Sequence, residues 1–277
     1  MWVIDNQQYL GQLDGWNRAA QFADGLFETM VVQNGVILGL SHHLDRLVHG
    51  LSRLHIELKS SELSDMFESY AHTFSDLSHH QNGVLKVIIS RGDSQRGYGF
   101  DHDITPHITA FYNELPNYDA SIYQVGVTVQ SLSTQCAIQP QLAGLKHLNR
   151  LENVLAKHEL GQQAFEGLMQ NHLGFVIEGT MSNVFFEHEG ALVTPDLSLS
   201  GVAGVMRGCI KKAATKLDMV VSEKDIPMSE ISMFSHGFIC NSVMGIVPIK
   251  QLNKKELNIG ELTQKLIDIR ESGEIYA

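Results

Sequence analysis

Short β-prone runs that end in tight-turn signals occur in both halves of this 277-residue chain, and they constrain its fold more than any other feature. In the first half, the segment ETMVVQNGVILG contains Asn34-Gly35, a dipeptide that strongly favours a two-residue β-hairpin. In the second half, the runs FEGLMQ and FVIEGT flank the turn-prone residues 171–174, NHLG. Antiparallel strands are therefore expected in both halves.

Segments with helical spacing of apolar residues alternate with these strands. Ser41 is a suitable N-cap for a helix whose apolar side chains recur on one face. That face consists of Leu44, Leu47, Val48, Leu51 and Leu54. Further helices are expected at about residues 61–77, from near His147, at about 204–217 and at the C-terminal end. The helix from near His147 has one repeating face, made of Leu151, Val154, Leu155 and His158. Strands and helices in each half, without an internal repeat, indicate an α+β fold class.

The chain is longer than one typical domain, so it is expected to form either one large domain or two smaller ones. The polar, proline-containing stretch NELPNYDAS has the character of a linker and predicts a domain boundary near Pro116. We expect a small N-terminal domain at 1–115 and a larger C-terminal domain at 116–277. The polar loop RGDSQRGYGFDHD, between the runs VLKVIIS and HITAFY, is a candidate binding loop.

Charge and cysteine content exclude several classes of partner. A net charge of -11 and a pI near 5.6 disfavour nucleic acid and anionic membrane surfaces, which require clustered Lys and Arg. The opening MWVIDNQQYL does not resemble a signal peptide, and no stretch approaches the roughly 18 apolar residues of a membrane span. Three widely spaced cysteines, Cys136, Cys209 and Cys240, suit reduced thiols. We expect an unprocessed cytoplasmic protein.

Fourteen histidines raise the question of a metal site. Pairs such as His42-His43 lack the i, i+4 spacing of zinc ligands on a helix, so no metal is expected. Gly92-Asp93-Ser94 lacks the G-x-S-x-G elbow of a hydrolase serine. The segment GVAGVMRG matches neither a Walker loop nor a dinucleotide fingerprint, but its glycines can form an anion-binding helix N-terminus.

Lys146, Glu178 and Arg46 each admit two interpretations. Lys146 lies in the stretch AGLKHLNRLENVLAKHEL and is either a desolvated, nucleophilic amine or a surface lysine. Glu178 ends the apolar run FVIEG, where a carboxylate either has a partner or lies at the surface. Arg46 either extends into solvent or binds a phosphate with its planar fork. The spacing of these residues leaves all three questions open.

Seven segments together resemble the fold-type IV pyridoxal-phosphate (PLP) enzymes. They are RAAQFADGLFET, HHLDRL, VLKVIISRGDSQRGYGF, GLKHLNRLENVLAKHEL, EGTMSNVFF, LSGVAGVMR and CNSVMGIVPI. They span residues 18 to about 249, nearly the whole chain. Within that family, SRGDSQRGY and LKHLNRLENVL look most similar to the aminodeoxychorismate lyases. The resemblance implies an α+β, two-domain fold of the D-amino-acid aminotransferase type, with a small N-terminal α/β domain and a larger, PLP-binding C-terminal domain that contains a barrel-like sheet.

The same resemblance implies how PLP is bound. Lys146 would hold the cofactor as a Schiff base and then move protons, and Glu178 would keep its pyridine nitrogen protonated. Arg46 would bind the phosphate. The backbone N–H groups of Val202 and Ala203 would share this role, because they lie where a loop enters a helix and the helix dipole favours an anion.

Five further positions receive roles from the resemblance. Ser242, with Asn241 beside it, matches the position of another phosphate contact. Arg96 and Tyr98 fall where relatives present groups to a substrate carboxylate, and a guanidinium fork suits that task. Thr29 matches a threonine that the lyases place near the reacting carbons, where its hydroxyl could relay a proton. From the residues alone, Thr29 is an ordinary β-branched strand residue.

The activity implied is conversion of 4-amino-4-deoxychorismate to 4-aminobenzoate and pyruvate in folate biosynthesis. The alternative is a D-amino-acid or branched-chain aminotransferase on the same scaffold, since FETM and the glycine-containing loop are shared in part. A binding protein that retains only the scaffold is disfavoured, because the lysine and the acid are both present. The resemblance also implies a homodimer that acts on a small-molecule substrate.

Overall fold

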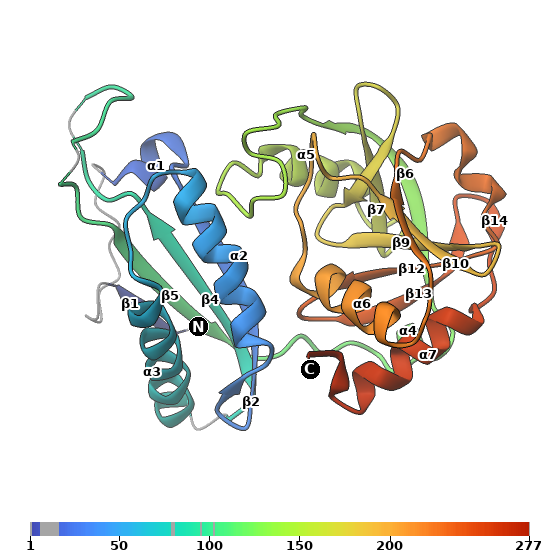
Figure 1. Ribbon diagram of the computed structural model, residues 1–277, viewed down its shortest axis with the longest axis horizontal. Helices are drawn as coiled ribbons and strands as arrows, with labels where there is room; N and C mark the ends of the chain where they lie inside the picture. The colour runs from blue at the N-terminus through green and yellow to red at the C-terminus, as the bar shows by residue number, and fades with distance from the viewer. Residues whose placement is uncertain (1, 6–16, 79–80, 95, 102, 277) are drawn as a thin grey trace. The chain divides into compact units, whose positions relative to one another are not determined.

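The computed structural model describes residues 2–5, 17–78, 81–94, 96–101 and 103–276. The chain forms two compact units, drawn in Figure 1. Unit 1 consists of Met1–Pro116 and Leu145–Asn149, and unit 2 consists of Asn117–Gly144 and Arg150–Ala277. The segment Leu145–Asn149, which contains Lys146, thus belongs to the first unit although it lies in the range expected for the second domain.

Unit 1 is built on a five-stranded sheet in which every neighbouring pair is antiparallel. In sheet order the strands are β1 (Trp2–Asp5), β5 (His107–Asn113), β4 (Gly83–Ser90), β2 (Gly25–Gln33) and β3 (Val36–Ile37). The turn between β2 and β3 contains Asn34 and Gly35, with φ of 51° and 76°. Positive φ at both positions is what a two-residue hairpin of this hand requires, so the predicted hairpin is confirmed.

Three helices accompany this sheet: α1 (Arg18–Phe22), α2 (Leu40–Arg53) and α3 (Ser60–Ser78). The apolar face predicted for α2 is buried at Leu47 and Leu51. Ser41 is not the N-cap of this helix, so that prediction is wrong. The cap is Gly39, whose φ of 64° lets the chain turn out of β3 sharply, and the Ser41 hydroxyl contacts the ring of His42 instead.

Unit 2 contains a nine-stranded mixed sheet that curls toward a barrel. Its strands in path order are β11 (Val221–Lys224), β10 (Ala191–Pro195), β9 (Asn183–His188), β12 (His236–Asn241), β13 (Gly245–Leu252), β6 (Val127–Cys136), β7 (Glu166–Asn171) and β8 (Val176–Gly179), with β14 (Lys255–Glu256) paired to β13. After β11 the chain runs alongside β8. There the N–H of Val176 donates to the carbonyl of Ile226 at 2.8 Å. This bond brings the two ends of the sheet together.

Both faces of the curled sheet are covered. Phe185 and Phe186 are neighbours on β9 and point to opposite faces, yet neither is exposed to solvent. Phe186 packs in the interior cluster with residues such as Val184, and Phe185 packs with Ile210 of a covering helix. The helices of this unit are α4 (Ser121–Gln124), α5 (Leu151–Leu160), α6 (Val205–Lys216) and α7 (Glu261–Glu271), with short 3-10 helices at Met228–Met233 and Glu274–Tyr276.

The helix expected from near His147 begins four residues later, at Leu151. Residues 146–148 form an antiparallel bridge with a strand of unit 1, and a helical conformation would remove the hydrogen bonds of that bridge. The repeating face of α5 is exposed in this chain: Leu151, Val154 and Leu155 are each at least 60% exposed. The positions of α5 that pack inward are Ala156 and Leu160.

The three cysteines are buried free thiols. Burial raises the pKa of Cys209 to about 11 and also raises the pKa values of Cys136 and Cys240, so all three stay protonated near neutral pH. Within the described part of the chain, no helix has the length and apolar character needed to cross a bilayer.

Candidate active site

Lys146 lies in an extended segment that pairs with β2. The N–H of Phe27 donates to the carbonyl of Lys146 at 3.0 Å, and the N–H of Leu148 donates to the carbonyl of Gly25, also at 3.0 Å. The backbone from the Lys146 carbonyl to the Leu148 N–H is therefore held at the edge of the sheet. The Nζ of Lys146 lies 4.2 Å from the centroid of the Phe27 ring, whose negative face attracts a charged amine.

Gly25 allows this segment to approach the sheet so closely. A Cβ at this position would lie 2.3 Å from the carbonyl oxygen of Ile89 on β4 and 3.0 Å from the side chain of Leu148. The first distance is too short for any real Cβ contact, so a larger residue would displace the β4 backbone and press on the side chain of Leu148. The glycine thus helps to set where Lys146 lies.

Arg46 forms a two-pronged ion pair with Glu28. Its Nε donates to Oε1 of Glu28 at 2.8 Å, and its second terminal nitrogen donates to Oε2 at 2.5 Å. The ring of His43 also contacts Oε2, with its Nδ1 at 2.7 Å. Because an ionised carboxylate only accepts hydrogen bonds, Nδ1 must carry the proton. Glu28 and His43 are almost fully buried, so the side-chain direction of Arg46 is set by a rigid partner.

This buried cluster predicts an acid-sensitive unit 1. Burial alone would raise the pKa of Glu28, but the charges and hydrogen bonds of Arg46 and His43 lower it to about 2 from 4.5. Burial lowers the pKa of His43 from its usual 6.5. Both groups have folded-state pKa values below their unfolded values. Their contributions to stability are therefore present above pH 6.5 and are lost progressively as the pH falls toward 2, by a few kcal/mol in total.

The measurement is the free energy of unfolding in urea between pH 7 and pH 3, followed by circular dichroism. We expect the free energy to fall with pH, and the slope to become shallower in Glu28→Gln, which lacks the carboxylate that titrates. Wild-type and variant curves of equal slope would contradict the prediction.

Thr29 lies two residues after Phe27 on β2, and alternate residues of a strand share a face. Lys86 of β4 lies opposite Thr29 in the register, and its Nζ is 5.2 Å from the Phe27 ring. The Nζ of Lys146 lies on the same ring. This part of unit 1 therefore presents the Thr29 hydroxyl together with two amines.

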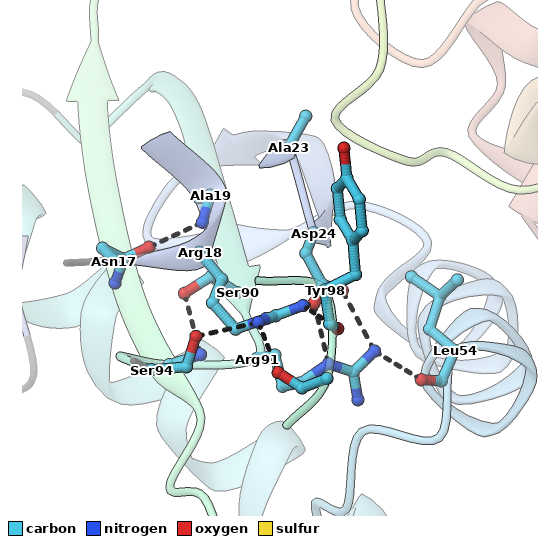
Figure 2. Close-up of polar contacts among 12 residues, drawn as sticks. Asn17, Arg18, Ala19, Ala23, Asp24, Leu54, Ser90, Arg91, Ser94 and Tyr98 are labelled. Carbon is cyan, nitrogen blue, oxygen red and sulfur yellow. Dashed lines mark hydrogen bonds and ion pairs between the residues drawn. The ribbon is translucent and has the colours of Figure 1, made fainter. Parts of the chain in front are cut away.

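The loop between β4 and β5 carries Arg96 and Tyr98. Both side chains are exposed, Tyr98 to 84%. The ring of Tyr98 is tilted against that of Phe22, with centroids 5.3 Å apart. The loop backbone contacts the buried guanidinium of Arg18, as Figure 2 shows. The structure therefore presents the two predicted substrate-binding side chains on an anchored backbone.

In unit 2, Glu178 lies one residue before the end of β8 and is 4% exposed. Its Oε2 accepts the N–H of Val202 at 2.8 Å. Gly201, just before Val202, has a φ of 81°, and a Cβ there would lie 2.6 Å from Ile177 and 3.2 Å from Oε2 of Glu178. A buried carboxylate and a glycine turn thus lie against each other at the entry to α6.

The backbone N–H groups that were predicted to bind phosphate have partners within the protein. The N–H of Val202 donates to Glu178, and the N–H of Ala203 donates to the carbonyl of Gly144 at 3.0 Å. Their assignment to a phosphate stays a prediction, and it requires these hydrogen bonds to be exchanged when the anion binds. The helix that follows, α6, starts after the N-cap Gly204.

Sequence reasoning missed two residues that support turns in this region, Asn183 at the turn before α6 and Glu166 at the turn between β8 and β9. Asn183 donates through Nδ2 to the carbonyl of Val202 at 2.9 Å and accepts the N–H of Gly204 at 3.1 Å. Glu166, which is fully buried, accepts the hydroxyls of Thr180 and Ser182 after β8. Asn183 lies within the family segment EGTMSNVFF, so the segment was recognised but this role was not. Nothing in the local pattern around Glu166 indicates its partners.

Asn241 and Ser242 lie at the end of β12, where the chain turns into β13. The Asn241 side chain accepts the N–H groups of Val243 and Met244 at 2.9 and 2.8 Å, and donates to the carbonyl of Met181 at 3.1 Å. Asn241 therefore stabilises this turn. Ser242 is partly buried in the turn, and its predicted phosphate contact stays a prediction.

The antiparallel sheet of unit 1 and the curled mixed sheet of unit 2 define the fold-type IV architecture, so the predicted fold class is confirmed. Residues 25–252 match the family model described as amino-transferase class IV. The chain belongs to the class IV aminotransferase family.

Individual relatives agree with this assignment. The chain is 31% identical to an aminodeoxychorismate lyase of Vibrio harveyi over 90% of its length and 92% of the relative's. It superposes on a 4-amino-4-deoxychorismate lyase structure from Pseudomonas aeruginosa with a TM-score of 0.92 and 36% identity, covering 97% and 98% of the two chains. It is 24% identical to a D-alanine aminotransferase of Bacillus licheniformis, over 88% of this chain and 84% of that one.

Proposed function

We propose that this protein is a PLP-dependent lyase that converts 4-amino-4-deoxychorismate to 4-aminobenzoate and pyruvate. The observation that carries the proposal is the common location of the Lys146 amine and Thr29 on one face of β2. The lyase relatives add support, because they match over nearly the whole of both chains. Thr29 is the residue that favours the lyase over an aminotransferase.

The side chains and backbone groups of the candidate site fit the chemistry of PLP. The primary amine of Lys146 suits covalent attachment of an aldehyde, and its backbone is fixed by hydrogen bonds to β2. The buried Glu178 carboxylate suits a protonated pyridine nitrogen. Arg46, whose direction is set by Glu28, and the N-terminal end of α6 suit the phosphate. We propose Ser242, with Asn241 shaping its turn, as a further phosphate contact.

When bound, PLP supplies an electron sink that stabilises negative charge next to the substrate amine. Lys146 then removes the proton at C4 of the substrate. The C–O bond to the enolpyruvyl group then breaks and the carbocyclic ring of the substrate becomes aromatic. The departing group takes up a proton to become pyruvate. The Thr29 hydroxyl relays that proton, and Arg96 and Tyr98 orient a substrate carboxylate. Glu178 keeps its negative charge throughout.

The product assay is the direct test. Purified protein supplied with PLP and 4-amino-4-deoxychorismate is expected to release 4-aminobenzoate and pyruvate in equal amounts, without any keto acid as a second substrate. Fluorescence follows the aromatic product, and lactate dehydrogenase coupling follows pyruvate. Thr29→Ser retains the hydroxyl, so it should retain more activity than Thr29→Val, which has a similar shape without it.

The alternative activity is amino transfer, because D-alanine aminotransferases are also relatives of this chain. Efficient transfer from D-alanine or leucine to a keto acid, with no release of 4-aminobenzoate, would reverse the proposal. We further propose a cytoplasmic homodimer that binds no nucleic acid. The net charge of -11 and the buried free cysteines are consistent with that setting.

A further inference from the structure

The loop that carries Arg96 and Tyr98 makes side-chain contacts through two rings, with Tyr98 against Phe22 at 5.3 Å and Phe100 over the Arg91 guanidinium at 3.8 Å. Residues 96–100 are exposed and form no helix or strand. A loop of this kind would ordinarily sample many backbone conformations. Its backbone instead meets one buried side chain, that of Arg18 at the start of α1, which is 3% exposed.

Both terminal nitrogens of the Arg18 guanidinium donate hydrogen bonds to the loop, as Figure 2 shows in part. One of them donates to the Ser94 hydroxyl at 2.8 Å and to the carbonyls of Gly97 and Gly99 at 3.4 and 3.2 Å. The other donates to the carbonyl of Tyr98 at 2.9 Å. Three consecutive carbonyls therefore point at a single guanidinium, which fixes the backbone at the residues next to Arg96.

The guanidinium is itself held from the other side. Its Nε donates to Oδ2 of Asp24 at 2.7 Å, and the rings of Phe22 and Phe100 lie 4.9 and 5.6 Å from its central carbon. A planar fork with five donors can face a carboxylate and a row of carbonyls at the same time. An ammonium group has three donors on one nitrogen, so it cannot span both sets.

Arg91 provides a matched comparison within the same cluster. It shares Asp24 with Arg18, through bonds of 2.8 and 3.0 Å, and it is equally buried. Its remaining donors meet the carbonyls of Leu54 and His55 at the end of α2, not those of residues 97–99. Arg91 meets the loop through the Phe100 ring, 3.8 Å from its central carbon, whereas Arg18 holds the backbone carbonyls of residues 97–99. The two arginines therefore differ in the one property of interest, which is hydrogen bonding to the loop backbone.

We propose that Arg18 is a positioning residue for substrate binding: by holding the carbonyls of residues 97–99, it sets the directions in which Arg96 and Tyr98 leave the loop. This inference rests on the proposed role of those two side chains in binding a substrate carboxylate. Arg18 does not touch the substrate itself. Its removal should therefore raise KM and leave kcat nearly unchanged.

The test compares Arg18→Lys with Arg91→Lys, because both changes keep the positive charge beside Asp24. In Arg18→Lys we expect KM to rise about 10-fold, equivalent to about 1.4 kcal/mol, with kcat changed less than about 2-fold. Trypsin should cleave after Arg96 about 10-fold faster, because cleavage reports opening of the loop. In Arg91→Lys both quantities should stay within about 2-fold of wild type.

The cleavage product is identified by mass spectrometry, and circular dichroism confirms that both variants are folded. Equal effects of the two variants would overturn the inference, since they would indicate general loosening of the cluster. Unchanged cleavage and KM in Arg18→Lys would also overturn it. If wild-type protein forms no 4-aminobenzoate, the proposed function fails on its own, and the cleavage rates still decide whether Arg18 holds the loop.

Discussion

Replacement of Lys146 by alanine is expected to abolish the visible-edge absorbance band of the protein with PLP and to lower kcat by about 10⁴-fold. In the proposed mechanism, the variant loses both the amine that attaches the cofactor and the base that removes the C4 proton. The fold should survive, because the two hydrogen bonds that hold this segment to β2 use backbone atoms only. The measurements are an absorbance spectrum and a product assay at saturating substrate.

Lys86 is the matched control for this experiment. Its amine also lies against the Phe27 ring, at 5.2 Å compared with 4.2 Å for Lys146. We expect Lys86→Ala to retain the absorbance band. Borohydride reduction of the wild-type protein followed by peptide mapping should find the cofactor on residue 146. Cofactor on residue 86, or a wild type that stays colourless with added PLP, would refute the assignment.

The second large effect is expected at Glu178. Replacement by glutamine keeps an oxygen that can accept the N–H of Val202, so the turn before α6 should be preserved. The negative charge is lost, and with it the proposed partner for a protonated pyridine nitrogen. We expect kcat to fall by about 10² to 10³-fold, while the thermal midpoint of unfolding changes little.

Glu187 offers a control of the same chemistry in the same unit. Its carboxylate accepts the N–H groups of Leu262 and Thr263 at the start of α7, so Glu187→Gln removes a charge that holds a helix end. That variant should lose some stability and keep kcat. If Glu178→Gln retained full kcat, Glu178 would have no electrostatic part in the reaction.

The local elements followed from short stretches of sequence. Asn34 and Gly35 sufficed for the hairpin between β2 and β3, because positive φ is a property of those residues themselves. The helix α3 begins and ends within one residue of its predicted range. The α+β class followed from the pattern of strands and helices. The fold-type IV architecture came from seven recognised segments, because periodicity indicates strands and helices but not how they pair.

Helical spacing also shows which residues share a face without showing whether that face is covered. The repeating residues of α5, from Leu151 to Leu155, are exposed in this chain, and Ala156 and Leu160 pack inward. Spacing likewise placed the start of this helix near His147. Pairing with β2 overrode that local tendency, since hydrogen bonds to a strand far away in sequence are available only in the folded chain.

By itself, the sequence determined which segments form strands, turns and helices, and it identified Lys146, Glu178, Arg46 and Thr29 as candidates by their family context. Only the tertiary structure decided that Lys146 belongs to the sheet of unit 1, that Arg46 is paired with Glu28, and that Arg18 holds a loop 76 residues away at Ser94. The physical reason is the distance along the chain over which each kind of interaction acts. Backbone propensities act over a few neighbouring residues, whereas a buried charge is defined by partners that the folded chain alone brings within hydrogen-bonding distance.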